Sequence, residues 1–491
     1  MLIQEKLLIS PAGLTLNQQQ TNAVNELHSW WNKVNKYPPY MLEFEEKFIG
    51  LCGVPGSGKS TSIWTFVAEL LREQPWAIAI AAPTHKAKNV LVQMALENGI
   101  TQCKITTIAS LLGVKSQLDD DGEDEFVFKR NKLKIDGFDL VIFDEVSMLS
   151  DRQWNYTKSL KDCPPLITMG DSEQLRPVKH KEKSPVFSEV PYWINLTEPV
   201  RYDGRIKDLV TAVKDSRHFV HPQKYADGVQ VQVLDKYTWI DSLAEDVAND
   251  VDGTEVRSLC FTNKLADWLN VNIHIESQLR RKGYSSSRDF FSFDVNVGDI
   301  SACRKIFGWQ VPIIPEYEPG MFLVFNKAVT EWDRWIKERV ILVNSGTVVQ
   351  VTNVQRHLEQ GFNCSSLIVE WKDVDDTGDV IGRSLQVFVL DDSDKKAFDE
   401  ALEEMRQAAL EYSNPDNQYR KQIFRERAQL RDKFANVSRT YASTIHKAQG
   451  SGFDKVYVHL GDILKCPDTD MAKELIYTAY SRAKKKLCIC V

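Results

Sequence analysis

A glycine-rich loop near the start of the chain has the residue types needed to hold a nucleotide phosphate. It follows the apolar run 48–52 and leads into a helical pattern over 61–71; its residues are Gly53, Pro55, Gly56, Ser57, Gly58, Lys59, Ser60 and Thr61. Glycines let backbone N–H groups approach phosphate oxygens, and the helix N-terminus adds positive potential. In this Walker A pattern the lysine reaches the terminal phosphates, and the Ser60 hydroxyl is a ligand for Mg²⁺. The sequence therefore predicts a site for a magnesium nucleotide.

Two acidic residues, Asp144 and Glu145, close the apolar run 140–143. Asp144 is predicted to hold Mg²⁺ through its water shell. Glu145 is predicted to orient and polarise the attacking water, because hydrolysis depends on positioning and charge stabilisation. A solvated acidic pair at a strand end is the alternative, and the phosphate loop upstream favours catalysis.

Three further polar side chains would complete a hydrolytic site. Gln174 follows the apolar run 166–169, where it can contact a γ-phosphate or the attacking water. Arg201 closes the run 196–201, and a guanidinium can stabilise the charge that spreads over a transferring phosphoryl group. Arg482 is predicted to stand in a helix near the C-terminus, from which it could reach across a cleft. For Arg201, a lone surface arginine is the alternative.

The elements that must position these side chains are short strands. Apolar runs at 48–52, 76–82, 140–143 and 166–169 alternate with helical segments, which is typical of a doubly wound parallel sheet. Ligands bind such sheets beyond the carboxyl ends of the strands, so the motifs are expected to converge on one edge. A second half repeats the pattern without a phosphate loop, with strands at 258–261 and 456–460. The predicted fold class is therefore α/β, with two nucleotide-binding halves.

Composition places the chain among multidomain soluble proteins. Its 491 residues, 43% of them apolar, suggest about three or four domains. No run approaches the roughly 20 apolar residues that cross a bilayer, so we expect a cytoplasmic protein with no membrane partner. The 9 scattered cysteines indicate neither a zinc site nor a disulfide framework. A net charge of −7 argues against a coat of nucleic acid, although one strand needs only a local basic groove.

In their order along the chain, the motifs resemble those of the superfamily 1 helicases. The likeness is strongest to the phage Dda-type and RecD-type helicases of superfamily 1B, and its segments are 53–60, 82–87, 144–148, 170–178, 196–201, 443–450 and 477–482. The resemblance implies two RecA-like P-loop NTPase domains with ATP and Mg²⁺ as cofactors. It also implies an ATP-dependent helicase that moves 5′ to 3′ on single-stranded DNA and unwinds duplex DNA, in replication or recombination.

The resemblance assigns roles to individual residues as well. Gln20 matches a glutamine that hydrogen-bonds adenine, with Gln18 and Gln19 as adjacent alternatives. Arg201 and Arg482 match two arginines that contact the γ-phosphate, one from each half. The residues expected to grip the DNA backbone are Pro83, Thr84, His85 and Lys86 in the first half and Ser443, Thr444, His446 and Lys447 in the second. Backbone contacts carry no sequence information, so little sequence preference is expected.

Two insertions divide the chain. The expected domains are 1–202, with a pin-like β-hairpin at 113–136; 203–277 joined with 437–491; and an inserted, tower-like domain at 278–436, β-rich and then a helical hairpin. The alternating apolar residues around an acidic turn predict the first insertion. By resemblance the hairpin would split the duplex with Phe126 or Phe128 stacked on a base; packing of these rings is the alternative. In the second insertion, Ser393 is expected to cap a helix with an apolar face over 398–412. A second helix is expected to return over 419–434, with Tyr419, Ile423, Leu430 and Phe434 as its apolar residues.

Several functions fit this pattern. The leading interpretation is a DNA helicase acting on single-stranded and forked duplex DNA, as a monomer in the cytoplasm of a prokaryotic or phage-infected cell. An RNA helicase or nucleoprotein remodeller would use the same backbone contacts. The third interpretation is a motor subunit that depends on partners within a larger recombination or replication complex. A DNA helicase could have a single-strand binding protein, or replication and recombination proteins, as partners, although no residue of the sequence indicates them.

Overall fold

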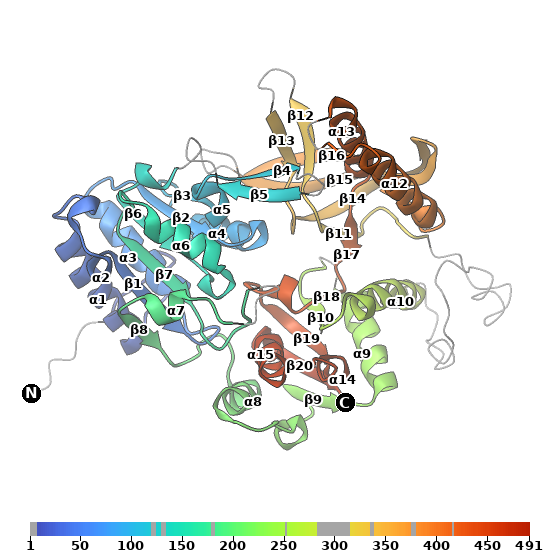
Figure 1. Cartoon of the computed structure of the whole chain (residues 1–491). Helices are drawn as coiled ribbons and strands as arrows, with labels where there is room; N and C mark the ends of the chain where they lie inside the picture. Colours follow the sequence, from blue (N-terminus) through green and yellow to red (C-terminus); the bar gives the residue numbers. More distant parts are fainter. Residues whose placement is uncertain are drawn as a thin grey trace, which may run out of the picture.

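The computed structural model describes residues 7–118, 124–128, 134–177, 182–250, 253–281, 315–333, 338–374, 380–414 and 417–491. Within these ranges the strands form two parallel sheets, one antiparallel sheet and two separate two-stranded hairpins (Figure 1). No helix in the same ranges is long and apolar enough to cross a membrane.

The first domain is built on a six-stranded parallel sheet in the order β3-β2-β6-β7-β1-β8. The strands are β1 (Phe48–Gly53), β2 (Ile78–Ala82), β3 (Lys104–Thr107), β6 (Leu140–Phe143), β7 (Leu166–Gly170) and β8 (Trp193–Leu196). The four predicted strands form the centre of this sheet, and β3 and β8 lie at its edges. The helices are α1 (Gln18–Val34), α2 (Phe44–Lys47), α3 (Lys59–Glu73), α4 (His85–Glu97), α5 (Ile108–Leu111), α6 (Asp151–Ser159) and α7 (Val186–Glu189).

Alternating residues of the central strands enter two cores, one on each face of the sheet. On β2, Ile78 and Ile80 pack with the residues of α1, α3 and α4, whereas Ala79 and Ala81 belong to the core that contains Trp154 of α6. A strand covered by helices on both faces has to be apolar along its whole length. This explains why these strands read as continuous apolar runs and why the sequence predicted them.

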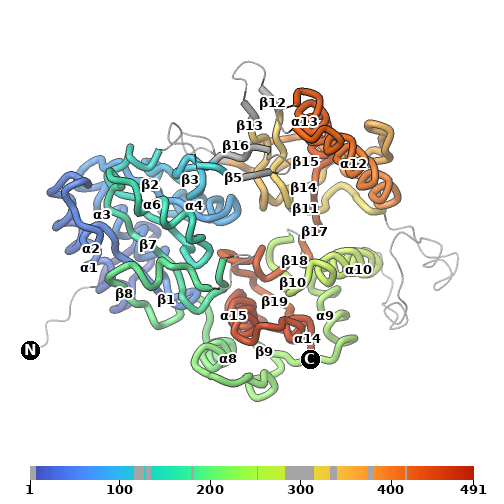
Figure 2. The backbone as a smooth tube through the Cα atoms, in the orientation of Figure 1, coloured from blue at the N-terminus to red at the C-terminus, as the bar shows by residue number. Residues whose placement is uncertain are grey.

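The second domain contains a five-stranded parallel sheet in the order β18-β10-β19-β20-β9. Its strands are β9 (Val231–Leu234), β10 (Val256–Cys260), β18 (Ala442–Thr444), β19 (Phe453–His459) and β20 (Ala483–Cys490), with helices α8 (Gly204–Asp215), α9 (Lys236–Asn249), α10 (Asn263–Arg281), α14 (Leu460–Ile463) and α15 (Thr469–Tyr480). The green segment and the red C-terminal segment therefore lie side by side (Figure 2). The predicted pair of α/β nucleotide folds is confirmed.

Arg482 differs from its prediction, because it does not lie in a helix. Helix α15 ends at Tyr480, and Arg482 stands in the short connection to β20. Its Nε donates to the carbonyl oxygen of Thr478 at 3.2 Å. The side chain thus satisfies a carbonyl group in the last turn of the helix, a common role for a basic residue at this position.

The first insertion is an antiparallel hairpin of β4 (Val114–Leu118) and β5 (Asp124–Phe128). Its strands pair Val114 with Phe128 and Ser116 with Phe126. β5 begins inside the acidic run that the sequence assigned to the turn. The turn itself, at 119–123, lies outside the described residues.

The second insertion is a five-stranded antiparallel sheet in the order β16-β15-β14-β11-β17, followed by a helical hairpin. Its elements are β11 (Phe322–Phe325), β14 (Val348–Glu359), β15 (Phe362–Val374), β16 (Val380–Leu390), β17 (Val437–Arg439), the separate pair β12 (Val329–Asp333) and β13 (Glu338–Val343), and the helices α12 (Lys395–Leu410) and α13 (Gln418–Lys433). The predicted boundaries need correction at both ends. Helix α10 of the second domain continues to Arg281, and residues 437–439 pair with β11, so they belong to the insertion sheet.

Both helices of this hairpin exist, but two details of their prediction were wrong. Asp394, not Ser393, is the N-cap of α12. Helix α13 buries Arg420, Phe424 and Ala428, whereas Tyr419 is 67% exposed. Arg420 lies on the inner face because its Nη1 donates to the carbonyl oxygen of Tyr412. A prediction from apolar residues alone starts the inner face at Tyr419, one residue before the buried Arg420.

Candidate active site

The loop between β1 and α3 takes a shape that requires glycine. Gly56 and Gly58 have φ of +77° and +89°, and Gly58 is the N-cap of α3. A Cβ atom on Gly58 would lie 2.1 Å from Nε2 of Gln20, and one on Gly56 would lie 2.5 Å from Cβ of Arg201. The loop therefore combines left-handed backbone with close packing from two other segments. Both features hold backbone N–H groups at the start of α3, where an anion is favoured.

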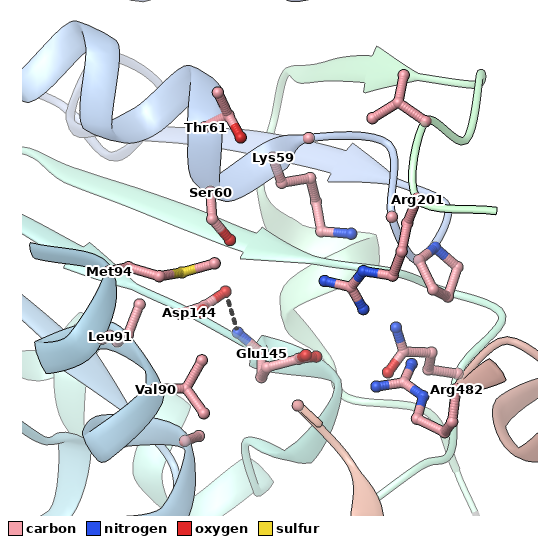
Figure 3. A pocket seen from close by; sticks show the side chains of 17 residues that line it. Lys59, Ser60, Thr61, Val90, Leu91, Met94, Asp144, Glu145, Arg201 and Arg482 are labelled. Carbon is pink, nitrogen blue, oxygen red and sulfur yellow. Dashed lines mark hydrogen bonds between the residues drawn. The ribbon is translucent and has the colours of Figure 1, made fainter. Parts of the chain in front are cut away.

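A pocket opens at this loop, between the two domains (Figure 3). Its lining combines the phosphate loop, one side of α4, the segments that follow β6, β7, β8 and β18, and the connection after α15. The residues are Pro55, Gly56, Gly58, Lys59, Ser60, Thr61, Ala87, Val90, Leu91, Met94, Asp144, Glu145, Gln174, Val200, Arg201, Gly450 and Arg482. All five predicted catalytic residues are in this set. The structure thus brings together groups that are more than 400 positions apart in the chain.

Some of the residues expected at the nucleotide do not line the pocket. Gly53 and Ser57 lie behind the loop surface. The carbonyl oxygen of Gly53 accepts a hydrogen bond from Lys59 Nζ at 2.6 Å, and Ser57 is only 1% exposed. The ammonium group of Lys59 therefore lies over its own loop, at the place where terminal phosphates are held in a Walker A site.

The acidic pair lies at the end of β6, facing the loop. The amide of Glu145 donates to Oδ1 of Asp144 at 2.9 Å. Glu145 has φ of 50° and ψ of 46°, one of two non-glycine residues with positive φ in the described ranges. Such strained backbone is concentrated at functional sites, where it directs a side chain into the site. The strain here turns Glu145 toward Arg201 and Arg482 (Figure 3).

The same pair fits a divalent cation. Burial, and next the charge of Glu145, raise the pKa of Asp144 above its usual range. In the described residues, no hydrogen-bond partner reaches the buried Oε2 of Glu145. The Ser60 hydroxyl points to the same space as Asp144 (Figure 3). A hydroxyl beside two crowded carboxylates is an oxygen donor set that Mg²⁺ prefers.

Two arginines and a glutamine face the acidic pair. Arg482 is 2% exposed, and its Nη1 donates to the carbonyl oxygen of Ser451 at 3.1 Å. Burial, and next the neighbouring Arg482, lower the pKa of Arg201. Oε1 of Gln174 is buried, and no partner for it lies among the described atoms. Two guanidinium groups with a buried amide oxygen suit a polyanion and a water molecule.

Gln20 braces the loop from behind. Its Nε2 donates to the carbonyl oxygen of Ser57 at 2.9 Å, and its Oε1 accepts from the amide of Asn17 at 2.9 Å, which closes a capping box at the start of α1. The alternatives make other contacts, Gln18 with Asn22 and Gln19 with Thr197. A contact of Gln20 with adenine stays a prediction, because the observed contacts of its amide are with the loop and the helix end.

The two groups of residues expected at DNA contact each other where the two domains meet. Thr84 caps α4, where its side chain accepts from the amide of Ala87. Lys86 Nζ donates to the carbonyl oxygen of Lys447 at 3.1 Å and lies 5.9 Å from the ring centre of Phe453. Pro83, Ser443 and His446 are half-buried, and Thr444 is buried. A role of these residues in DNA binding stays a prediction.

The hairpin aromatics have different positions. The Phe128 ring lies 4.2 Å from the ring of Tyr156 on α6, with the Arg152 guanidinium 5.2 Å from its centre. It therefore packs on the first domain, close to the base of the hairpin. The side chain of Phe126 lies outside the described residues. Stacking of either ring on a base stays a prediction.

The sequence missed the groups that join the domains behind the pocket. Arg176 of the first domain forms an ion pair with Glu474 of α15, and the hydroxyl of Tyr477 donates to Asp171. It also missed the apolar wall that Val90, Leu91 and Met94 of α4 give the pocket. The spacing of these three apolar residues is that of an ordinary helix face packed in a core. Arg176 and Glu474 stand 298 positions apart, so the sequence around either residue gives no sign of the ion pair.

Together these features define a P-loop NTPase whose site is shared by two RecA-like domains. The AAA domain family matches residues 41–180, and the UvrD-like helicase C-terminal domain family matches residues 439–490. The two matches cover the phosphate loop and Arg482, the opposite sides of the pocket.

The chain is similar to known helicases over most of its length. It is 25% identical over 471 residues to the ATP-dependent DNA helicase dda of Enterobacteria phage T4, covering 92% of this chain and 96% of that protein. It is 33% identical over 135 residues to the ATP-dependent RecD2 DNA helicase of Deinococcus radiodurans, covering 27% of this chain and 16% of that protein. A crystal structure of the Pif1 helicase from Bacteroides aligns with 97% of this chain and 93% of that chain, at a TM-score of 0.45 and 15% identity. The resemblance to the phage Dda-type and RecD-type helicases, which the motifs predicted, is confirmed by these relatives.

Proposed function

We propose that this protein is an ATP- and Mg²⁺-dependent DNA helicase that moves 5′ to 3′ on single-stranded DNA and unwinds duplex DNA ahead of it. The observation that carries the proposal is the shared pocket. Arg201 of the first domain and Arg482 of the second line the same pocket as Lys59 and Glu145. A nucleotide bound there contacts both domains, so its hydrolysis can change the angle between them.

The residues around the pocket suit hydrolysis of a nucleoside triphosphate. Lys59 and the backbone of the loop bind the β- and γ-phosphates, with Ser60 and Asp144 as the residues that would hold Mg²⁺, which supplies charge neutralisation when bound. Glu145 accepts a proton from the water that attacks the γ-phosphorus, as the bond to the ADP oxygen breaks. Gln174 orients that water, and the two guanidinium groups stabilise the charge on the transferring group.

The place where the expected DNA residues meet supports coupling of this reaction to movement. Lys86 stands at the N-terminus of α4, whose next turns form one wall of the pocket, and its partner Lys447 lies three residues before Gly450, another lining residue. A change in the angle of the domains therefore separates or joins the two groups. If each group holds the strand in turn, opening and closing of the cleft produce steps along it.

The choice of DNA over RNA is supported by two relatives that are named DNA helicases. The 5′-to-3′ direction rests on the resemblance of the motifs to those of superfamily 1B. We further propose that the chain works as a monomer on single-stranded and forked DNA, in the cytoplasm of a prokaryotic or phage-infected cell. An RNA helicase, and a subunit that depends on partners, are the alternatives that an unwinding assay separates.

The test is unwinding of forked substrates by the purified chain with ATP and Mg²⁺. One fork carries a free 5′ single-stranded tail, one a free 3′ tail, and a third has an RNA loading strand. We expect strand separation only from the 5′ DNA tail, and none with Glu145→Gln. Separation only from the 3′ tail would overturn the direction, preference for the RNA tail would overturn the substrate, and a need for added extract would favour a subunit that depends on partners.

A further inference from the structure

The loop that carries Gln174 is fastened to the second domain by a buried ion pair. Arg176 Nη2 donates to Oε1 of Glu474 at 2.9 Å, and Arg176 Nε donates to Oε2 of Glu474 at 3.1 Å. The backbone N–H of Arg176 reaches the same oxygen at 3.4 Å. The side chains of Arg176 and Glu474 are 10% and 7% exposed. A bidentate pair with this burial has strict geometry, unlike most surface ion pairs.

Two more contacts leave the same short segment, 171–176, toward the second domain. The hydroxyl of Tyr477, one turn after Glu474 on α15, donates to Oδ2 of Asp171 at 2.9 Å. Gln449 Nε2 donates to the carbonyl oxygen of Leu175 at 3.4 Å. The segment is thus held at both of its ends by α15 and in between by the segment that contains Gly450.

This fastening acts on both sides of the pocket. On one side, Gln174 lies between Asp171 and Arg176 and lines the pocket. On the other side, α15 ends at Tyr480, and the Arg482 guanidinium is tied to the last turn of that helix through the carbonyl oxygen of Thr478. A rotation of α15 against the segment 171–176 would therefore move Arg482 relative to Gln174 and Glu145.

We propose that the Arg176–Glu474 pair is a positioning device: it sets where Arg482 stands in the pocket, and so links the γ-phosphate site to the angle between the domains. The inference rests on the proposed function. Neither residue lines the pocket, so both act through Arg482 and Gln174 rather than on the nucleotide. Because the pair lies at the domain boundary, its strength depends on the angle between the domains.

The experiment uses the full chain with Arg176→Gln, Glu474→Gln and the double variant. Asp468→Asn is the matched control, since Asp468 also accepts from Arg176, at 3.3 Å, but is 45% exposed. For each variant, kcat and KM of ATP hydrolysis are measured with saturating oligo-dT, together with the dissociation constant of a fluorescent ATP analogue. Amide hydrogen exchange of α15 is measured without nucleotide or DNA.

We expect each single variant to lose about tenfold in kcat while the dissociation constant changes less than about twofold, and the double variant to lose no more than the worse single one. Exchange should rise in α15, and Asp468→Asn should behave as wild type. The charge swap Arg176→Glu with Glu474→Arg should recover part of kcat. Wild-type kcat in both single variants, or additive losses in the double variant, would overturn the inference. A wild-type chain that does not hydrolyse ATP with DNA would instead overturn the proposed function, while the exchange data still show whether the pair holds α15.

Discussion

Lys86 Nζ donates to the carbonyl oxygen of Lys447 at 3.1 Å, although the two residues stand 361 positions apart in the chain. The contact joins the start of α4 in the first domain to the segment after β18 in the second. It places the two segments that the family resemblance expects at DNA at one junction of the domains.

The protonation of Lys86 should make DNA binding depend on pH. Burial, and next the charges of Arg257 and Arg482, lower the pKa of Lys86 to about 7. A DNA phosphate favours the charged amine, so binding takes up a proton whenever the free amine is neutral. We therefore expect affinity for oligo-dT to fall as the pH rises from 7 to 9, by at most about tenfold per unit, with little change below 7.

The measurement is fluorescence anisotropy of labelled oligo-dT at constant ionic strength. Lys86→Met should remove the dependence between pH 7 and 9, and Lys88→Met on the same helix should keep it. Burial lowers the pKa values of His85 and His446 below their ordinary value, so these groups stay neutral in this window. An unchanged slope in Lys86→Met would exclude Lys86 as the titrating contact.

The two arginines of the pocket should be needed as guanidinium groups rather than as positive charges. Arg201→Lys and Arg482→Lys each keep the charge but lose the planar set of donors, so we expect kcat of ATP hydrolysis to fall about a thousandfold. Arg205→Ala is the control, because Arg205 is 54% exposed and lies outside the pocket lining. Near-normal kcat in both lysine variants would show that neither guanidinium acts on the transferring phosphoryl group.

Gln20 should support the phosphate loop for every nucleotide alike. Gln20→Ala removes the hydrogen bond to the carbonyl oxygen of Ser57, which is worth about 1 kcal/mol, so we expect KM to rise about fivefold for ATP and GTP together. Gln19→Ala, which loses an exposed contact with Thr197, serves as the control. A selective loss for ATP, with GTP unchanged, would instead support the contact with adenine that the family resemblance implies.

Phe128 should matter for stability more than for strand separation. Its half-buried ring packs on Tyr156, so Phe128→Ala should lower the free energy of unfolding by about 1–2 kcal/mol and leave unwinding per hydrolysed ATP unchanged. Chemical denaturation and a fork assay measure the two quantities on the same preparation. Normal stability with lost unwinding would reverse this assignment and favour a stacking role at the fork.

The sequence predicted, from local signals, which polar residues meet at the pocket beside the phosphate loop. A strand buried on both faces has to be apolar, and the polar residues that follow it have to meet at one sheet edge. That logic found Lys59, Asp144, Glu145 and Gln174, which all lie within a few residues of a strand end. The edge strands β3 and β8 escaped it, because residues such as Lys104 and Asn195 are exposed and interrupt the apolar run.

Relationships between distant segments could not be predicted in the same way. The pair of Arg176 with Glu474 depends on how two domains dock, and neither residue stands out locally. The inner face of α13 was misplaced because Arg420 is buried by a hydrogen bond to a carbonyl group, which hydropathy does not register. The hairpin register follows from the pairing of Val114 with Phe128, which the sequence around the turn leaves open.

DNA should stimulate ATP hydrolysis at a nucleotide site that both domains share. The most direct test is steady-state ATP hydrolysis by the full chain, with and without oligo-dT, in wild type and Lys59→Ala. We expect oligo-dT to stimulate the wild type at least about tenfold, and Lys59→Ala to lose nearly all hydrolysis under both conditions while remaining folded. Hydrolysis that is indifferent to DNA, or that survives in Lys59→Ala, would contradict the account.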